Sequence, residues 1–127
     1  MIAVRTLKEI RDIGFVLLSN WNAERKEIAL KGKNLYNLIA LKKKIVEESE
    51  KIQEGLNVIS EQSGGILDQE KGQYKIPQDK VPEVVKKMDE MLAETTEIEY
   101  EPIIITEDCS LPIGLMDILF DFIEFQD

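Results

Sequence analysis

Glu97, Glu99 and Glu101 alternate with apolar residues in one short segment. Alternation with a period of two places the three carboxylates on one face of a β-strand and the apolar side chains on the other. Carboxylates can bind Mg²⁺ in nucleases, but such sites also need a nearby lysine, and the last forty residues contain no lysine or arginine. We interpret the glutamate face either as solvated or as a negatively charged contact surface.

A second candidate lies near the C-terminus, where aromatic and acidic residues are interleaved over residues 117–125. Pro112 is expected to open a helix there. Its predicted apolar stripe is Leu115, Ile118, Leu119, Phe122 and Ile123. Phe120 and Phe125 fall off this stripe and cannot easily enter the core with it. Aromatics flanked by acids are typical of an anchor for a partner with a basic rim, and burial of the segment against a long helix is the alternative. The predicted partner-binding residues are Glu97, Glu99, Glu101, Asp117, Phe120, Asp121, Glu124 and Phe125.

The sequence predicts no catalytic, cofactor-binding or metal-binding residues. It has no histidine, and its one cysteine, Cys109, follows an acidic residue, which is not the setting of a reactive thiolate. The spacing of Asp68, Glu70 and Gly72 faintly resembles a calcium loop, but the turn glycine and the twelfth-position glutamate are both missing, so we expect an ordinary solvated turn. We therefore expect a protein that is not an enzyme and that uses no cofactor.

Charge is distributed unevenly along the chain. Residues 1–46 carry ten basic and four acidic residues, residues 47–87 carry six and nine, and residues 88–127 carry none and twelve, which gives the net charge of −9. An acidic protein is not expected to bind nucleic acid or anionic membranes. Lys42, Lys43 and Lys44 are consecutive, so on a helix they point in different directions and form no single basic patch. We expect a solvated face or pairing with the chain's own acids there, or a docking surface.

A single cysteine and the lack of a signal peptide or apolar span favour a cytoplasmic protein. Its 127 residues are typical of one domain.

Helical patterns dominate residues 1–62. Thr6 and Glu9 form a capping box, which predicts a helix that starts there and breaks near Trp21. Trp21 is expected in the core or between helices, with a partner anchor as the alternative. Residues 22–33 could be a loop or the first turns of the next helix. From about Asn34, apolar residues at near-heptad spacing predict a helix of about 28 residues that ends before Ser63. We expect it to pair with the first helix as an antiparallel hairpin, or with a second copy of the chain.

Residues 63–127 mix strands and helices. Residues 63–72 read as a loop, 73–76 as a short strand, 80–94 as a helix and 97–105 as a strand through Pro102. If the strands pair directly across the helix, the right-handed crossover rule makes them parallel. Val81, Val84, Val85, Met88, Met91 and Leu92 are the predicted buried face of the helix. The predicted fold is α+β and mostly helical: one domain over 1–127, with a helical hairpin (1–62), a loop (63–72) and a strand-helix-strand-helix unit (73–127).

The order of these features resembles small tailed-phage proteins of Gram-positive hosts. The likeness rests on a basic LKGKNLYNLIALKKKIVEE helix, a glycine-containing turn, a GQYKI strand, an amphipathic helix, an acidic EIEYEPI strand and a C-terminal helix, within residues 28–125. The first helix and the NWNAER segment have no counterpart. The resemblance implies a phage context and no particular chemistry.

Two main hypotheses follow. The first is a phage accessory protein that acts by protein–protein contact as an assembly factor, virion component or homo-oligomer. The second is an acidic inhibitor of a host nucleic-acid-binding or defence protein, whose carboxylates imitate phosphate charge. A remote third is a carboxylate-metal enzyme. The location would be the host cytoplasm or the virion.

Overall fold

The computed structural model describes residues 1–126. Its helices and strands are β1 (Ile2–Thr6), α1 (Leu7–Glu24), α2 (Gly32–Gln62), β2 (Ile66–Asp68), β3 (Gln73–Lys75), α3 (Val81–Ala93), β4 (Thr95–Glu99), β5 (Ile103–Ile105), α4 (Ile113–Ile118) and β6 (Ile123–Phe125). Short 3₁₀ turns lie at Arg25–Glu27, Gln78–Lys80 and Phe120–Phe122. The prediction of a mostly helical α+β fold is confirmed. No helix among the described residues has the length and apolar character needed to cross a bilayer.

Helix α1 starts where its capping box predicts. The Thr6 hydroxyl accepts a hydrogen bond from the Glu9 amide at 3.1 Å, and a Glu9 carboxylate oxygen accepts one from the Thr6 amide at 3.2 Å. The predicted break near Trp21 is wrong, because the helix continues to Glu24. Instead of competing with the helix, the Ser19 hydroxyl donates to the carbonyl of Phe15 one turn back, at 2.8 Å. Residues 22–33 therefore divide between the end of α1, a 3₁₀ turn, an extended link and the first two residues of α2.

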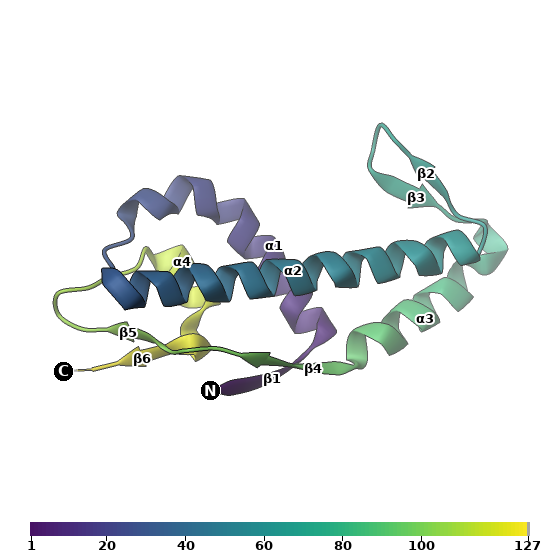
Figure 1. Cartoon of the computed structure of the whole chain (residues 1–127). Helices are drawn as coiled ribbons and strands as arrows, with labels where there is room; N and C mark the ends of the chain where they lie inside the picture. Colours follow the sequence, from purple (N-terminus) through teal and green to yellow (C-terminus); the bar gives the residue numbers. More distant parts are fainter. Residues whose placement is uncertain (127) are drawn as a thin grey trace.

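The long helix α2 forms the axis of the molecule, and α1 crosses it obliquely (Figure 1). It starts at Gly32, two residues earlier than expected, and ends before Ser63 as predicted. Its core face is fully buried through Leu38, Leu41, Ile45, Ile52 and Leu56. The helices contact each other at Gly14, whose missing side chain leaves room for Ser49 of α2. The long helix thus finds its first partner within the chain.

The strands form three separate two-stranded sheets. β1 pairs antiparallel with β4, β2 pairs antiparallel with β3, and β5 pairs parallel with β6. The predicted pairing of 73–76 with 97–105 is therefore wrong, and the assignment of 63–72 as a turn or loop is wrong at Ile66–Asp68, which form β2. Residues 73–75 find a nearer partner in β2, because the Asp68 carboxylate accepts hydrogen bonds from the amides of Glu70 and Lys71 and Gly72 takes a φ of +65°. The acids that faintly resembled a calcium loop shape this turn.

The predicted strand 97–105 is also divided. β4 ends at Glu99 and β5 begins at Ile103, so the chain changes sheets around Pro102, which lacks the amide that a continuous ladder would use. Its alternation is confirmed on the first side of this break, because Ile98 is buried while Glu97 and Glu99 are exposed.

The predicted C-terminal helix is correct only to Ile118. A 3₁₀ turn follows, and residues 123–125 then form β6 along β5 (Figure 1). The core still receives Leu115, Leu119 and Phe122, which are 0–1% exposed, because the 3₁₀ turn continues the inward direction of α4.

Helix α3 is less buried than its pattern predicts. Val84 is buried, but Val81 and Val85 are 40% and 49% exposed, while Met88, Met91 and Leu92 are partly buried. The helix lies beneath only the C-terminal half of α2 (Figure 1), so one row of side chains is enough for the contact. The hairpin of β2 and β3 projects from the end of α2 (Figure 1), and the Tyr74 hydroxyl of β3 donates a hydrogen bond to the Glu61 carboxylate of α2.

Candidate functional site

Phe120 and Phe125 form an exposed aromatic pair. Their side chains are 59% and 53% exposed, and their ring centroids lie 5.9 Å apart at a tilt of 45°. Buried Leu119 and Phe122 fix the turn that carries Phe120, and pairing with β5 fixes the strand that carries Phe125. Two apolar rings are thus held at the surface by a rigid backbone, which limits the entropy that a binding partner would have to overcome.

Three carboxylates lie in the same segment as the aromatic pair. Asp117, Asp121 and Glu124 are all exposed. Asp121 is tied to the body of the protein, because its carboxylate accepts a hydrogen bond from the Arg5 guanidinium at 3.1 Å. The same guanidinium lies 5.9 Å from the centroid of the Phe122 ring. Arg5 therefore joins β1 to the turn that presents Phe120.

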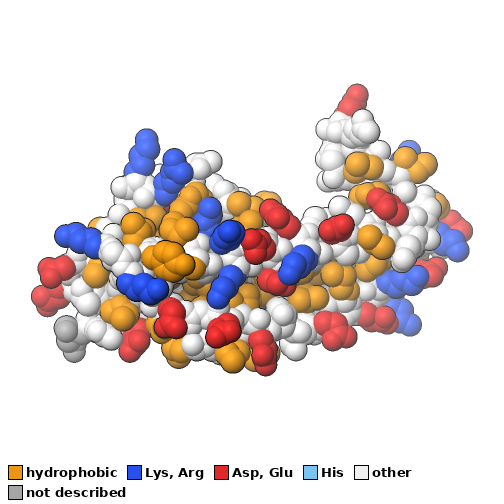
Figure 2. Space-filling view, viewed as in Figure 1, with side chains coloured by type: hydrophobic (Ala, Val, Ile, Leu, Met, Phe, Trp, Pro, Cys, Tyr) orange, Lys and Arg blue, Asp and Glu red, His pale blue; other side chains and the backbone are white. Residues whose placement is uncertain are grey.

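The outer face of the β1–β4 sheet is half apolar and half acidic. Ile2 lies opposite Glu99 and Val4 lies opposite Glu97. The two apolar side chains are 61% and 54% exposed, and Ala3 between them faces the core. Figure 2 shows acidic and hydrophobic side chains interleaved along the lower edge of the molecule, where these strands run. The glutamate face predicted from the sequence is therefore present for Glu97 and Glu99, and it has an apolar neighbour.

Glu101 lies apart from the other two strand glutamates. It follows the end of β4 and lines a shallow pocket with Lys33, Tyr36 and Lys44. The Lys44 ammonium donates a hydrogen bond to the backbone carbonyl of Glu99 at 2.6 Å, so positive charge adjoins this end of the strand. All the residues predicted to bind a partner are exposed, but Glu101 belongs to a locally mixed surface.

The sequence interpretation missed β1 as part of this surface. In residues 2–6 the β-branched side chains of Ile2, Val4 and Thr6 alternate with Ala3 and Arg5. This alternation with a period of two indicates a strand whose β-branched residues share one face. Thr6 is both the last residue of β1 and the N-cap of α1, and the sequence interpretation used only its capping pattern. Ile2 and Val4 could have been found from this alternation.

The sequence interpretation counted Lys33 and Lys43 in a basic cluster with Lys31, Lys42 and Lys44, and left a docking surface open there. It missed that Tyr36 and Ile39 lie with Lys33 and Lys43 on the outer face of α2, where the four residues form a basic patch. These residues recur every three or four positions opposite the buried stripe, so they share one side of the helix. Tyr36 is 64% exposed and Ile39 44% exposed, and the Lys33 ammonium lies 4.6 Å from the Tyr36 ring centroid. Figure 2 shows hydrophobic atoms framed by basic side chains over the N-terminal half of α2.

The consecutive lysines point in different directions, as predicted. Lys42 turns toward α1 and lies 4.3 Å from the Trp21 ring centroid, whereas Lys44 reaches the carbonyl at the end of β4. Trp21 is half-buried against the core, in agreement with a role in helix packing. Only Lys43 of the three belongs to the basic patch.

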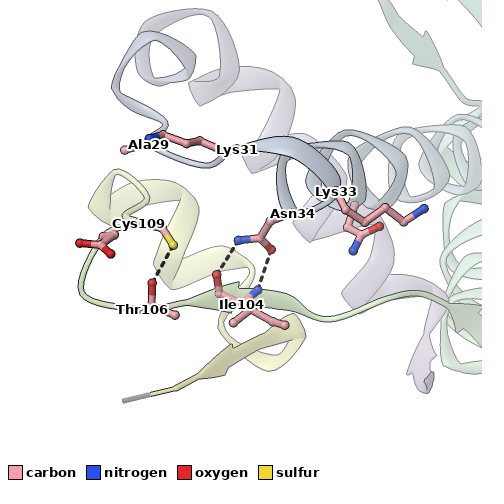
Figure 3. Close-up of a pocket in the computed structure, with 9 residues that line it drawn as sticks. Ala29, Lys31, Lys33, Asn34, Ile104, Thr106 and Cys109 are labelled. Carbon is pink, nitrogen blue, oxygen red and sulfur yellow. Dashed lines mark hydrogen bonds between the residues drawn. The ribbon is translucent and has the colours of Figure 1, made fainter.

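A pocket of about 410 Å³ separates the start of α2 from β5 (Figure 3). On its floor, the Asn34 side-chain amide donates to the carbonyl of Ile104 at 2.6 Å and accepts from the amide of the same residue at 2.8 Å. Asn34 thus covers the edge of β5 as a neighbouring strand would. The Thr106 hydroxyl lies 3.0 Å from the sulfur of Cys109, a free cysteine that is half-buried. The contacts of Asn34 stabilise the strand.

Titration and metal binding add little to this picture. Glu9, whose pKa is lowered, lies in the α1 cap, and Tyr74, whose pKa is raised, lies in the β2–β3 hairpin. Within residues 1–126, no three side chains of the metal-binding types converge. No known family model, curated protein or solved structure matches this chain. The likeness to phage proteins stays a prediction from the sequence pattern.

Proposed function

We propose that this protein is a non-enzymatic accessory protein of a tailed phage that acts in the host cytoplasm, or in the virion, by protein–protein contact. The contact surface is the aromatic pair, Phe120 and Phe125, with its acidic rim of Asp117, Asp121 and Glu124. Its partner would carry an apolar recess with basic residues around it. The phage context comes from the sequence resemblance alone.

The observation that carries the proposal is the exposure of two ordered aromatic rings beside one another. Burying a large apolar side chain contributes roughly 1.5–3 kcal/mol, so each half-exposed ring retains a substantial share of that free energy for a partner. Binding surfaces concentrate affinity in a few such aromatic anchors, and surrounding polar groups exclude water and select the partner. The acidic rim supplies the second part.

A second candidate function is the imitation of nucleic-acid charge. The exposed side chains of Glu97 and Glu99 point to the same face of β4, so they are about 6.7 Å apart along the strand, which is twice the rise per phosphate of one DNA strand. A host protein that binds phosphates would then be the target. Ile2 and Val4 beside them favour a mixed contact over a purely electrostatic one.

Affinity capture from a lysate of a Gram-positive host tests the proposal. The baits are the wild-type chain, Phe120→Ser with Phe125→Ser, and Glu97→Gln with Glu99→Gln. Phe15→Ser is the control, because this ring on α1 is 72% exposed and lies outside the proposed surface. We expect the control to retain the partner and the double phenylalanine variant to lose it.

The salt dependence of capture separates the two functions. The Debye length falls from roughly 10 Å at about 0.1 M salt to roughly 3 Å at about 1 M. An aromatic contact should persist over this range, whereas a charge mimic should be released and should also be lost in the double glutamine variant. Retention of every partner by the double phenylalanine variant would reject the proposed surface.

A further inference from the structure

The basic patch and the aromatic pair have complementary properties. The patch presents Tyr36 and Ile39 between Lys33 and Lys43. The aromatic pair presents two rings among three carboxylates, Asp117, Asp121 and Glu124. Each has an exposed apolar centre and a charged rim, and the rims have opposite sign. Such an arrangement favours encounter in one orientation and fixes the register of a contact.

The chain neutralises these surfaces only in part: Arg5 pairs with Asp121 of the acidic rim, and Glu101 lines a pocket beside Lys33 of the basic patch. Among the described residues, the ion pairs are Arg5–Glu9, Arg5–Asp121, Lys51–Glu48 and Lys87–Glu83. Only the second joins the basic N-terminal third to the acidic C-terminal third. Lys33 and Lys43 form no ion pair in this set, and the Lys44 ammonium donates a hydrogen bond to the backbone carbonyl of Glu99. The opposite charges at the two ends of the sequence thus remain available at the surface.

We infer that the occupant of the basic patch is a second copy of this chain, which docks its Phe120–Phe125 pair against Tyr36 and Ile39. This inference rests on the proposed function and names its partner. The two surfaces differ, so the contact is heterologous: each copy offers one surface to the copy before it and the other to the copy after it. The assembly would be a ring or an open chain of subunits.

The charge of the whole chain limits this association. Each copy carries a net charge of −9, so copies repel one another at long range. At about 0.1 M salt the Debye length of roughly 10 Å screens most of that repulsion but only part of the attraction between groups in contact. Association should therefore be measurable near this ionic strength. Because the centre of the contact is apolar, it should persist toward about 1 M salt, with an affinity reduced only by the screened rims.

The test uses two variants that each remove one surface. Phe120→Ser with Phe125→Ser removes the aromatic pair and keeps the basic patch. Tyr36→Ser with Lys43→Glu removes the patch and keeps the aromatic pair. All four positions are exposed, so the folds should be preserved, which circular dichroism and thermal melting check. Mass is measured by sedimentation equilibrium over increasing protein concentration.

We expect the wild-type chain to grow beyond two copies, and each variant alone to stay at the mass of one chain. An equal mixture of the variants has one intact surface of each kind, so it should form a two-chain species and nothing larger. A wild-type chain that stays monomeric overturns the inference, as does a mixture that stays monomeric or grows as large as the wild type.

Failure here is distinguishable from failure of the proposed function. A monomeric wild-type chain that still captures a lysate protein through Phe120 and Phe125 would leave that function standing with a different partner. Loss of both self-association and capture would end both.

Discussion

Gly14 offers the sharpest test of the helix packing. A Cβ atom added there would lie 2.6 Å from the Cβ of Ser49 and 2.7 Å from its hydroxyl oxygen. Carbon atoms pack comfortably at about 3.5–4.0 Å, so Gly14→Ala forces α1 and α2 apart by about 1 Å or distorts the contact. Overpacking of this kind costs about 1–3 kcal/mol, while alanine gains about 1 kcal/mol over glycine in helix propensity.

Gly55 provides the matched control on α2. A Cβ there would lie 2.6 Å from the terminal methyl carbon of Met91, the flexible end of a half-buried side chain that can rotate away. Gly55→Ala should therefore keep most of its propensity gain of about 1 kcal/mol. We expect Gly14→Ala to be less stable than Gly55→Ala by about 1–3 kcal/mol in urea unfolding at equilibrium.

A double-mutant cycle completes this test. Adding Ser49→Gly to Gly14→Ala removes the atoms that clash, so the two changes should be less costly together than the sum of their separate effects. Equal stability of the Gly14 and Gly55 variants, or the absence of coupling to Ser49, would refute the close approach of the helices.

Further predictions concern the caps and edges of the fold. Asn34→Ala should leave the outer amide and carbonyl of Ile104 without partners, at about 1–3 kcal/mol, and speed amide exchange in β5. Hydrogen bonds from Thr6, and then the charge of Arg5, lower the pKa of Glu9 from 4.5. The stability that the ionised Glu9 side chain contributes is therefore present at neutral pH and lost as pH falls below 4.5. Thr6→Ala should raise the pKa of Glu9 in a carboxyl NMR titration. A hydrogen bond to a carboxylate of α2 raises the pKa of Tyr74 above 10.0, so the tether of the β2–β3 hairpin should be lost only as pH rises through that raised value, and Tyr74→Phe should abolish this alkaline change in hairpin amide exchange.

Local patterns predicted the elements that local physics controls. The Thr6 and Glu9 capping box fixes the start of α1 through neighbours three residues apart. The apolar stripe of α2 needs only a period and an end signal, and both are present before Ser63. The alternation of Glu97, Ile98 and Glu99 likewise survives in β4, because a half-buried strand imposes that period wherever it pairs.

Strand partners could not be predicted in the same way. β4 pairs with β1 across most of the chain, and β6 pairs with β5, although neither choice is visible in the local pattern of either strand. β3, which was predicted to pair with 97–105, pairs instead with β2. The turn of four residues between β2 and β3 closes with far less loss of entropy than a long crossover. Asn34 shows the same limit, since its contact with Ile104 joins positions seventy residues apart.

Phe120 and Phe125 are exposed, as predicted, but the structural reason for their exposure differs from the predicted one. Phe120 and Phe125 were separated from the core by their place on a presumed helix. In the structure they belong to a 3₁₀ turn and to β6, and the core receives Leu119, just before Phe120, and Phe122, which lies between the two. The turn brings the two ring centroids to 5.9 Å from each other. On a continuous helix, residues five positions apart would not be neighbours, so the helix prediction could not reveal this pair.

In the proposed function, partners bind through the Phe120–Phe125 pair and its acidic rim. Amide hydrogen exchange measured on the free chain and on its saturated complex tests this directly, whether the partner is another copy or a different protein. We predict that residues 117–125 gain protection in the complex while the outer face of α1 around Phe15 does not. Added protection confined to α1, with residues 117–125 unchanged, would contradict the claim.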